Sequence, residues 1–177
     1  MHVNAKKTAV SGLLMALSVL LLVLSGVLDF STLFFLAAAA FFVGIIIKEY
    51  GLGYGAAFFI GCTILGFLLA PQKLYCITYA MMGIYVLGGE ALWQYLGKHP
   101  TWNHRKMIFT AGKFVIFNLM YLPALLLFPK LIFAGELSEK LILVFLLGGQ
   151  AALFVYDKAY EYFLVQMWGQ VREKLFK

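Results

Sequence analysis

Polar side chains that could contact a substrate lie inside long apolar stretches of this sequence. Between residues 139 and 166, Glu139, Gln150, Asp157 and Glu161 follow one another at intervals of eleven, seven and four residues. These intervals place the four side chains on one stripe of a helix. Because a charge within a membrane is costly, we expect the stripe to face a bundle interior or a wet cavity. For Asp157 and Glu161, a solvated helix end fits the sequence equally well.

Glu90 and Lys113 form a second candidate feature. They fall in consecutive apolar stretches, at similar predicted depth. An ion pair between them would compensate two charges that have been removed from water. Such a pair could hold two helices together, or it could be coupled to a substrate or to a partner subunit.

A third feature is a set of residues suited to contact with a small molecule. A ligand site needs aromatic and apolar walls together with a few polar groups. Residues of these kinds lie toward the predicted outer ends and the centres of the apolar stretches, and an ordinary hydrated helix end is the alternative interpretation. The candidates for substrate contact are Tyr75, Tyr79, Asn118, Tyr121, Glu139 and Gln150.

Catalytic and metal-binding signatures do not accompany these residues. The sequence contains no HExxH, no GxSxG and no phosphate-binding loop. Cys62 and Cys76 have no metal-ligand spacing, and His2, His99 and His104 fall in predicted cytoplasmic segments. The sequence therefore predicts neither an enzyme, nor a metal site, nor a cofactor.

Composition and hydropathy identify the elements that must position the candidate residues. Of the 177 residues, 63% are hydrophobic and 12% are charged, whereas a soluble domain has roughly 25% charged residues. A chain this short cannot hide so much apolar surface from water. We therefore predict an all-α integral membrane protein, with one transmembrane domain over residues 1–177. Its six spans are expected near residues 8–28, 31–47, 53–70, 74–97, 107–129 and 139–166.

Basic residues predict the orientation of these spans. Cytoplasmic segments carry an excess of lysine and arginine. One predicted side of the membrane holds Lys6, Lys7, Lys48, Lys98, Arg105, Lys106, Arg172, Lys174 and Lys177, and the other holds Lys73, Lys130 and Lys140. Both termini are therefore expected in the cytoplasm. This distribution also accounts for the net charge of +6 without a nucleic-acid partner.

The first apolar stretch has small residues on two opposite faces. Ala9, Gly12 and Ala16 share one face, and the opposite face carries Ser11, Ser18 and Ser25. Small residues allow helix backbones to approach closely in lipid. Packing within the protein explains one such face, and a partner helix from another protein is the alternative interpretation for the other.

The first stretch and the overall layout resemble the substrate-binding S component of energy-coupling factor (ECF) transporters. Those proteins have six spans, a similar length and basic cytoplasmic ends. In several of them an Ala-xxx-Ala pattern on the first helix contacts a shared coupling subunit. Here Lys6-Lys7 is followed by Gly12-Leu13-Leu14-Met15-Ala16, with glycine in the first place of that pattern. The region from Glu49-Tyr50-Gly51 through Pro71-Gln72-Lys73 to Gly83-Ile84-Tyr85 also resembles bacterial membrane proteins of this general type.

The resemblance implies a subunit of a vitamin or micronutrient importer in the bacterial cytoplasmic membrane. Such a subunit binds a small molecule at its outward face. Through Ala9, Gly12 and Ala16 it would dock to a transmembrane coupling subunit and, through that subunit, to two ATPases. The metal-transporting members begin with a histidine-rich N-terminus, whereas this chain has only His2 there, which argues against a metal substrate.

A scaffold protein that does not transport is the alternative. The rod-shape determinant MreD has a similar size and span count, and a protein that resembles it would hold partner proteins. A transporter subunit needs a cavity in the outer half of its bundle, lined by residues such as Tyr75, Tyr79, Tyr121 and Gln150. The same region of a scaffold can be packed solid.

Overall fold

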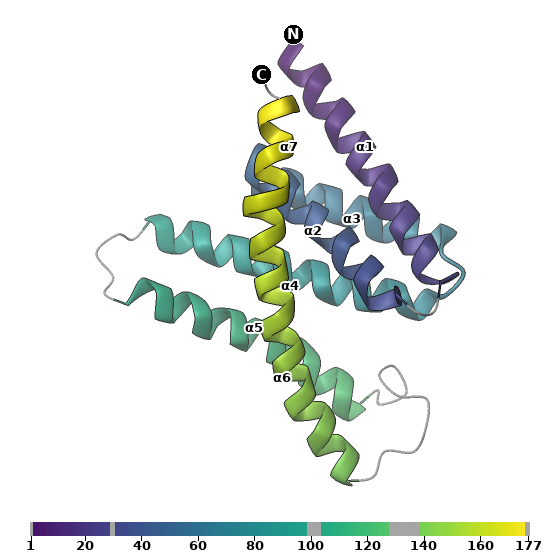
Figure 1. The fold of residues 1–177 in the computed structure, drawn as a ribbon, viewed down its shortest axis with the longest axis vertical. Helices are drawn as coiled ribbons and strands as arrows, with labels where there is room; N and C mark the ends of the chain where they lie inside the picture. The colour runs from purple at the N-terminus through teal and green to yellow at the C-terminus, as the bar shows by residue number, and fades with distance from the viewer. Residues whose placement is uncertain (1, 29–30, 99–103, 128–138, 176–177) are drawn as a thin grey trace. The chain divides into compact units, whose positions relative to one another are not determined.

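The computed structural model describes residues 2–28, 31–98, 104–127 and 139–175 (Figure 1). These residues are helical apart from short connections, and they contain no strand. The helices are α1 (His2–Ser25), α2 (Thr32–Tyr50), α3 (Leu52–Leu69), α4 (Lys73–Lys98), α5 (Arg105–Leu127) and α6 (Glu139–Tyr162), which continues through the π-helical turn η3 (Phe163–Met167) into α7 (Trp168–Leu175).

Six of these helical stretches are long and apolar enough to cross a membrane. The shortest, α3, has 18 residues, which corresponds to about 27 Å at 1.5 Å per residue. This length is close to the roughly 30 Å thickness of the hydrocarbon core. The predicted fold class is therefore confirmed at the level of six apolar helices, whereas the cytoplasmic location of both termini stays a prediction.

A single glycine separates α2 from α3. Gly51 has φ 93°, a left-handed conformation that glycine adopts without steric cost. Its N–H donates to the Ile47 carbonyl over 2.9 Å, and its own carbonyl accepts from the Gly55 N–H over 3.1 Å. One residue therefore ends the second helix and begins the third, which is why the sequence between their apolar runs is so short.

Lys73 stabilises the C-terminal end of α3. Its Nζ donates to the Ala70 carbonyl over 3.0 Å and also to the Phe67 carbonyl. The same ammonium group lies 5.3 Å from the centre of the Phe67 ring. The last carbonyls of a helix have no partner within the helix, and a cation there also interacts favourably with the helix dipole. Lys73 therefore has a structural role at this turn.

The last helix extends beyond the predicted span, and the end of that span near residue 166 stays a prediction. Helical structure runs from α6 through η3 to Leu175. A helix depends on backbone hydrogen bonds and not on lipid, and no proline interrupts residues 159–175.

The chain divides into two compact units, Met1–Trp102 and Asn103–Lys177. We refer to them as the α1–α4 unit and the α5–α7 unit. The prediction of one transmembrane domain over residues 1–177 stays a prediction.

In the α1–α4 unit, α2 is the central element and contacts α1, α3 and α4. Its residues Val43, Ile45, Ile46 and Ile47 are at most 2% exposed. Small residues bring the neighbouring helices close to this core. A Cβ atom at Gly83, for example, would lie only 2.3 Å from Cε2 of Phe59. This is the packing expected in lipid, where close contact of helices replaces the hydrophobic driving force.

Candidate functional site

Three polar contacts join α5 to α6. Along α5 they involve Lys113, Asn118 and Tyr121, and along α6 they involve Asp157, Gln150 and the Phe145 carbonyl. Later positions on α5 meet earlier positions on α6, so the two helices run antiparallel. We call these six residues the polar seam.

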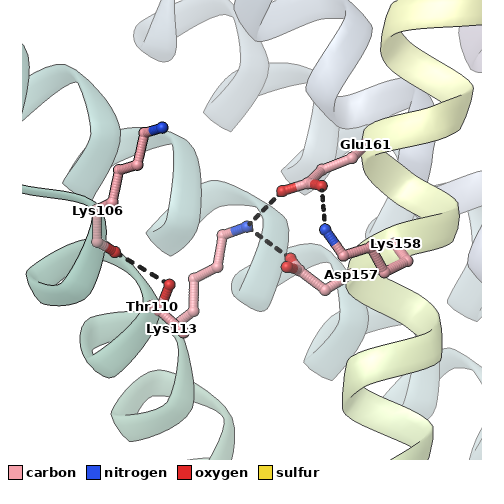
Figure 2. A network of polar contacts seen from close by, with 6 residues as sticks. All are labelled: Lys106, Thr110, Lys113, Asp157, Lys158 and Glu161. Atoms are coloured by element: carbon pink, nitrogen blue, oxygen red, sulfur yellow. Dashed lines mark hydrogen bonds and ion pairs between the residues drawn. The ribbon is translucent and has the colours of Figure 1, made fainter.

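An ion pair occupies one end of the polar seam (Figure 2). Lys113 Nζ lies 2.6 Å from Asp157 Oδ1 and 3.9 Å from Glu161 Oε1. Lys158 Nζ in turn lies 3.0 Å from Glu161 Oε2. The Lys113 side chain is buried, and its ammonium group also lies 4.3 Å from the centre of the Phe109 ring. Two cations and two carboxylates thus form a network without net charge.

The carboxylate that contacts Lys113 is Asp157, which differs from the expected partner. Glu90, the predicted partner, lies on α4 in the α1–α4 unit and is half-buried. The proposed Glu90–Lys113 pair stays a prediction. Asp157 belongs to the same α5–α7 unit as Lys113. The antiparallel arrangement of α5 and α6 places the two side chains opposite each other. The sequence had placed Asp157 on the polar stripe of α6 but gave no register against α5.

A pair of carboxamides occupies the middle of the polar seam. Gln150 Nε2 donates to Asn118 Oδ1 over 2.8 Å, and Asn118 Nδ2 donates to Gln150 Oε1 over 3.4 Å. Asn118 Nδ2 also donates to the Phe114 carbonyl over 2.9 Å. Both side chains are half-buried. The structure thus brings together two of the residues predicted to contact a substrate.

Tyr121 occupies the other end of the polar seam. Its hydroxyl donates to the Phe145 carbonyl over 2.6 Å. Its ring stacks on Phe117 with 5.0 Å between centroids and 17° between planes. Gly149 leaves room for this ring, since a Cβ there would lie 2.4 Å from Tyr121 Cζ. Tyr121 is the third predicted substrate-contact residue at the polar seam, and the need for Gly149 gave no signal in the sequence.

The remaining predicted contact residues take no part in the polar contacts of the seam between α5 and α6. Tyr75 and Tyr79 are on α4 in the α1–α4 unit. Tyr79 is fully buried, and its ring lies 5.9 Å from that of Phe59. Glu139 is the first residue of α6, and its side chain lies outside the described residues. The role of these three residues in binding stays a prediction.

A small polar cluster in the core of the α1–α4 unit was not predicted. Ser18 Oγ donates to the Ala39 carbonyl over 3.1 Å and links α1 to α2. The Cys62 thiol lies close to the side chains of Ser18 and Tyr79. Ser18, Cys62 and Tyr79 are all fully buried. This cluster connects four helices through their interior and leaves Cys62 as a buried packing residue.

The predicted docking face of α1 points away from that core. Ala9, Gly12 and Ala16 are exposed, and nothing lies within 4 Å of a Cβ placed on Gly12. Ser18 and Ser25, on the opposite face, are buried. Packing inside the protein therefore uses the serine face, whereas docking of a partner at the other face stays a prediction.

Among the described residues, no group of three or more His, Cys, Asp or Glu side chains could hold a metal ion. No protein family, curated protein or solved structure matches this chain.

Proposed function

We propose that this protein is the substrate-binding membrane subunit of a small-molecule importer, and that the polar seam contacts the substrate. The observation that carries this proposal is the meeting of Asn118, Gln150 and Tyr121 between two helices apolar enough to span a membrane. Polar side chains at membrane depth are costly, and where they occur they mark pathways and binding sites for solutes.

The location follows from the helices and the basic residues together. Six apolar helices suit a multi-pass membrane protein. The excess of lysine and arginine on one predicted side supports cytoplasmic termini. We propose the bacterial cytoplasmic membrane as the site of action.

Coupling to an energy source is the finer part of the proposal. The resemblance to ECF S components implies a transmembrane coupling subunit and two ATPases. An exposed face of small residues, Ala9, Gly12 and Ala16, supports docking of a partner helix on α1. The chain would then bind the substrate, and its partners would supply the energy.

One observation favours the scaffold as a second candidate. Each contact of the polar seam already joins two groups of the protein, from Lys113–Asp157 to Tyr121–Phe145. Hydrogen bonds between membrane helices can serve packing alone. In that case the seam would stabilise a protein that holds others in place.

Native mass spectrometry of the full chain, released directly from its membrane, tests the proposal. A transport subunit is expected to carry a small molecule. Gln150→Met should lose it, because methionine keeps the length of the side chain but removes the amide. Gln170→Met, on an exposed position of α7, is the matched control and should retain it. Protein partners without any small molecule would favour the scaffold instead.

A further inference from the structure

We infer that the polar seam takes an uncharged ligand with a hydrogen-bond donor and an acceptor side by side, as on the edge of a lactam, a urea or a carboxamide. This inference rests on the proposed function and names the ligand class of that site. It follows from the mutual pairing of Asn118 and Gln150, which have the same donor–acceptor pattern.

The hydrogen bonds of the two amides leave capacity for a ligand. Each carboxamide has two N–H donors and an oxygen with two lone pairs. Asn118 uses its Nδ2 donors on the Phe114 carbonyl and on Gln150 Oε1. Gln150 gives one N–H to Asn118 Oδ1, and within the described part of the chain its second N–H has no acceptor. One donor and a lone pair on each amide oxygen therefore remain for another molecule.

The two hydrogen bonds of the amide pair differ in length, and the longer one is the weaker. The bond from Gln150 Nε2 to Asn118 Oδ1 is 2.8 Å long, whereas the return bond from Asn118 Nδ2 to Gln150 Oε1 is 3.4 Å long. Ordinary N–H···O bonds have lengths of about 2.7–3.2 Å. The longer bond is thus the one that a ligand displaces at least cost. A ligand with both a donor and an acceptor can accept from Asn118 Nδ2 and donate to Gln150 Oε1, and so replace the hydrogen bond that it displaces.

The Asn118–Gln150 pair is incompletely buried, so its unused hydrogen-bond donor and lone pairs are accessible to a ligand. Asn118 and Gln150 are only half-buried, so the protein does not enclose the pair completely. Amide groups that face acyl chains lose hydrogen bonds to water and gain nothing in return. A polar ligand that hydrogen-bonds to the two amides compensates for the lost hydrogen bonds to water.

The charges near the seam exclude an ion as the preferred ligand. Lys113 is paired with Asp157 over 2.6 Å, and Lys158 is paired with Glu161 over 3.0 Å. An anionic ligand would compete with a carboxylate for its lysine, and a cationic ligand would compete with a lysine. A charge of the largely buried Lys113–Asp157 pair left without its counterion is costly, whereas a neutral ligand leaves this pair intact.

Tyr121 restricts how the ligand is recognised. Its ring stacks on Phe117, its hydroxyl is bonded to the Phe145 carbonyl, and Gly149 lies against it. With these contacts the ring is a fixed wall and not a mobile stacking partner. The hydrogen-bonding edge of the ligand, read by the two amides, thus determines which molecule binds.

Equilibrium dialysis of the full chain in lipid nanodiscs tests the inference with two probes of similar shape. Uracil has lactam edges, and 1,3-dimethyluracil keeps the ring and the carbonyls but has no N–H donor. Uracil is expected to bind saturably and at least about tenfold more tightly, the effect of one lost hydrogen bond. Gln150→Met should abolish this preference, and Gln170→Met should preserve it. The comparison of the two probes on the unaltered chain does not depend on the folding of a variant.

Equal binding of the two probes, no binding of uracil, or tighter binding of benzoate or benzylamine would overturn the inference. The result of native mass spectrometry separates this failure from that of the proposed function. A charged molecule that co-purifies with the protein and is lost in Gln150→Met overturns the neutral ligand class and leaves the transport subunit standing. Absence of any small molecule, together with no uracil binding, overturns both.

Discussion

The α1–α4 unit and the α5–α7 unit differ in how far their helices are covered and in what joins them. In the most apolar window of α2, 56% of the residues are buried, against 11% in α5 and 6% in the last span. Small residues and apolar side chains account for most of the packing in the first unit, as at Gly83 and Phe59, together with the buried Ser18–Ala39 hydrogen bond. Side-chain hydrogen bonds and an ion pair join α5 to α6. Close packing thus joins the helices of the first unit, and paired polar groups join α5 to α6 in the second.

The largest effect is expected at the ion pair of the polar seam. Lys113→Met should lower the free energy of unfolding by about 3 kcal/mol, because it leaves Asp157 without its counterion at a largely buried site. The double variant Lys113→Met with Asp157→Leu should recover most of that loss. Denaturation by SDS in mixed micelles measures both. Lys158→Met, at an exposed position, is the control and should leave the unfolding midpoint unchanged.

The loss of unfolding free energy in the double variant would equal the sum of the losses in Lys113→Met alone and Asp157→Leu alone if the two side chains acted independently. The α5–α7 unit would then not depend on polar pairing, and the contrast between the two units would disappear.

A smaller effect is expected from a larger side chain in the first unit. Gly83→Leu should destabilise the protein by about 1–3 kcal/mol, because its Cβ would overlap the Phe59 ring. Gly12→Leu is the matched control, since nothing lies within 4 Å of a Cβ there. The same SDS titration compares them. Equal stability of the two variants would contradict close packing as the basis of the α1–α4 unit.

The smallest effect is expected from two adjacent glycines on α6. Gly149→Ala should displace the Tyr121 ring, break its hydrogen bond to the Phe145 carbonyl and cost about 1 kcal/mol. Gly148→Ala meets no atom within 4 Å and should stabilise the helix by about 0.5 kcal/mol. Thermal unfolding followed by circular dichroism distinguishes them. Identical midpoints would mean that Tyr121 does not determine the spacing of α5 and α6.

The sequence was sufficient to predict the helices because each apolar run has about the length that a membrane requires. A short break between the spans near 31–47 and 53–70 was expected, and the structure narrows the interruption of the helices to Gly51. The continuation of the last helix through η3 and α7 was not expected. Residues 167–175 lie beyond the apolar run that indicated the span, yet they are helical.

The candidate site was predicted residue by residue but not as an arrangement. Periodicity along one helix placed Gln150 and Asp157 on a common stripe, and Asn118 and Tyr121 were identified by residue type. Their partners depend on the register of α5 against α6, on which a pattern along a single helix has no bearing. For the same reason, Asp157 was not recognised as the residue opposite Lys113.

The length of the last helix has a mechanical consequence. Its three segments have 24, 5 and 8 residues without a break, so the rod is about 55 Å long and exceeds the roughly 30 Å of hydrocarbon. When such a long rod tilts in the membrane, the end that extends beyond the hydrocarbon core moves sideways. The π turn in between adds one residue to a turn of helix, and this rotates the protruding end about its own axis relative to the side that faces α5.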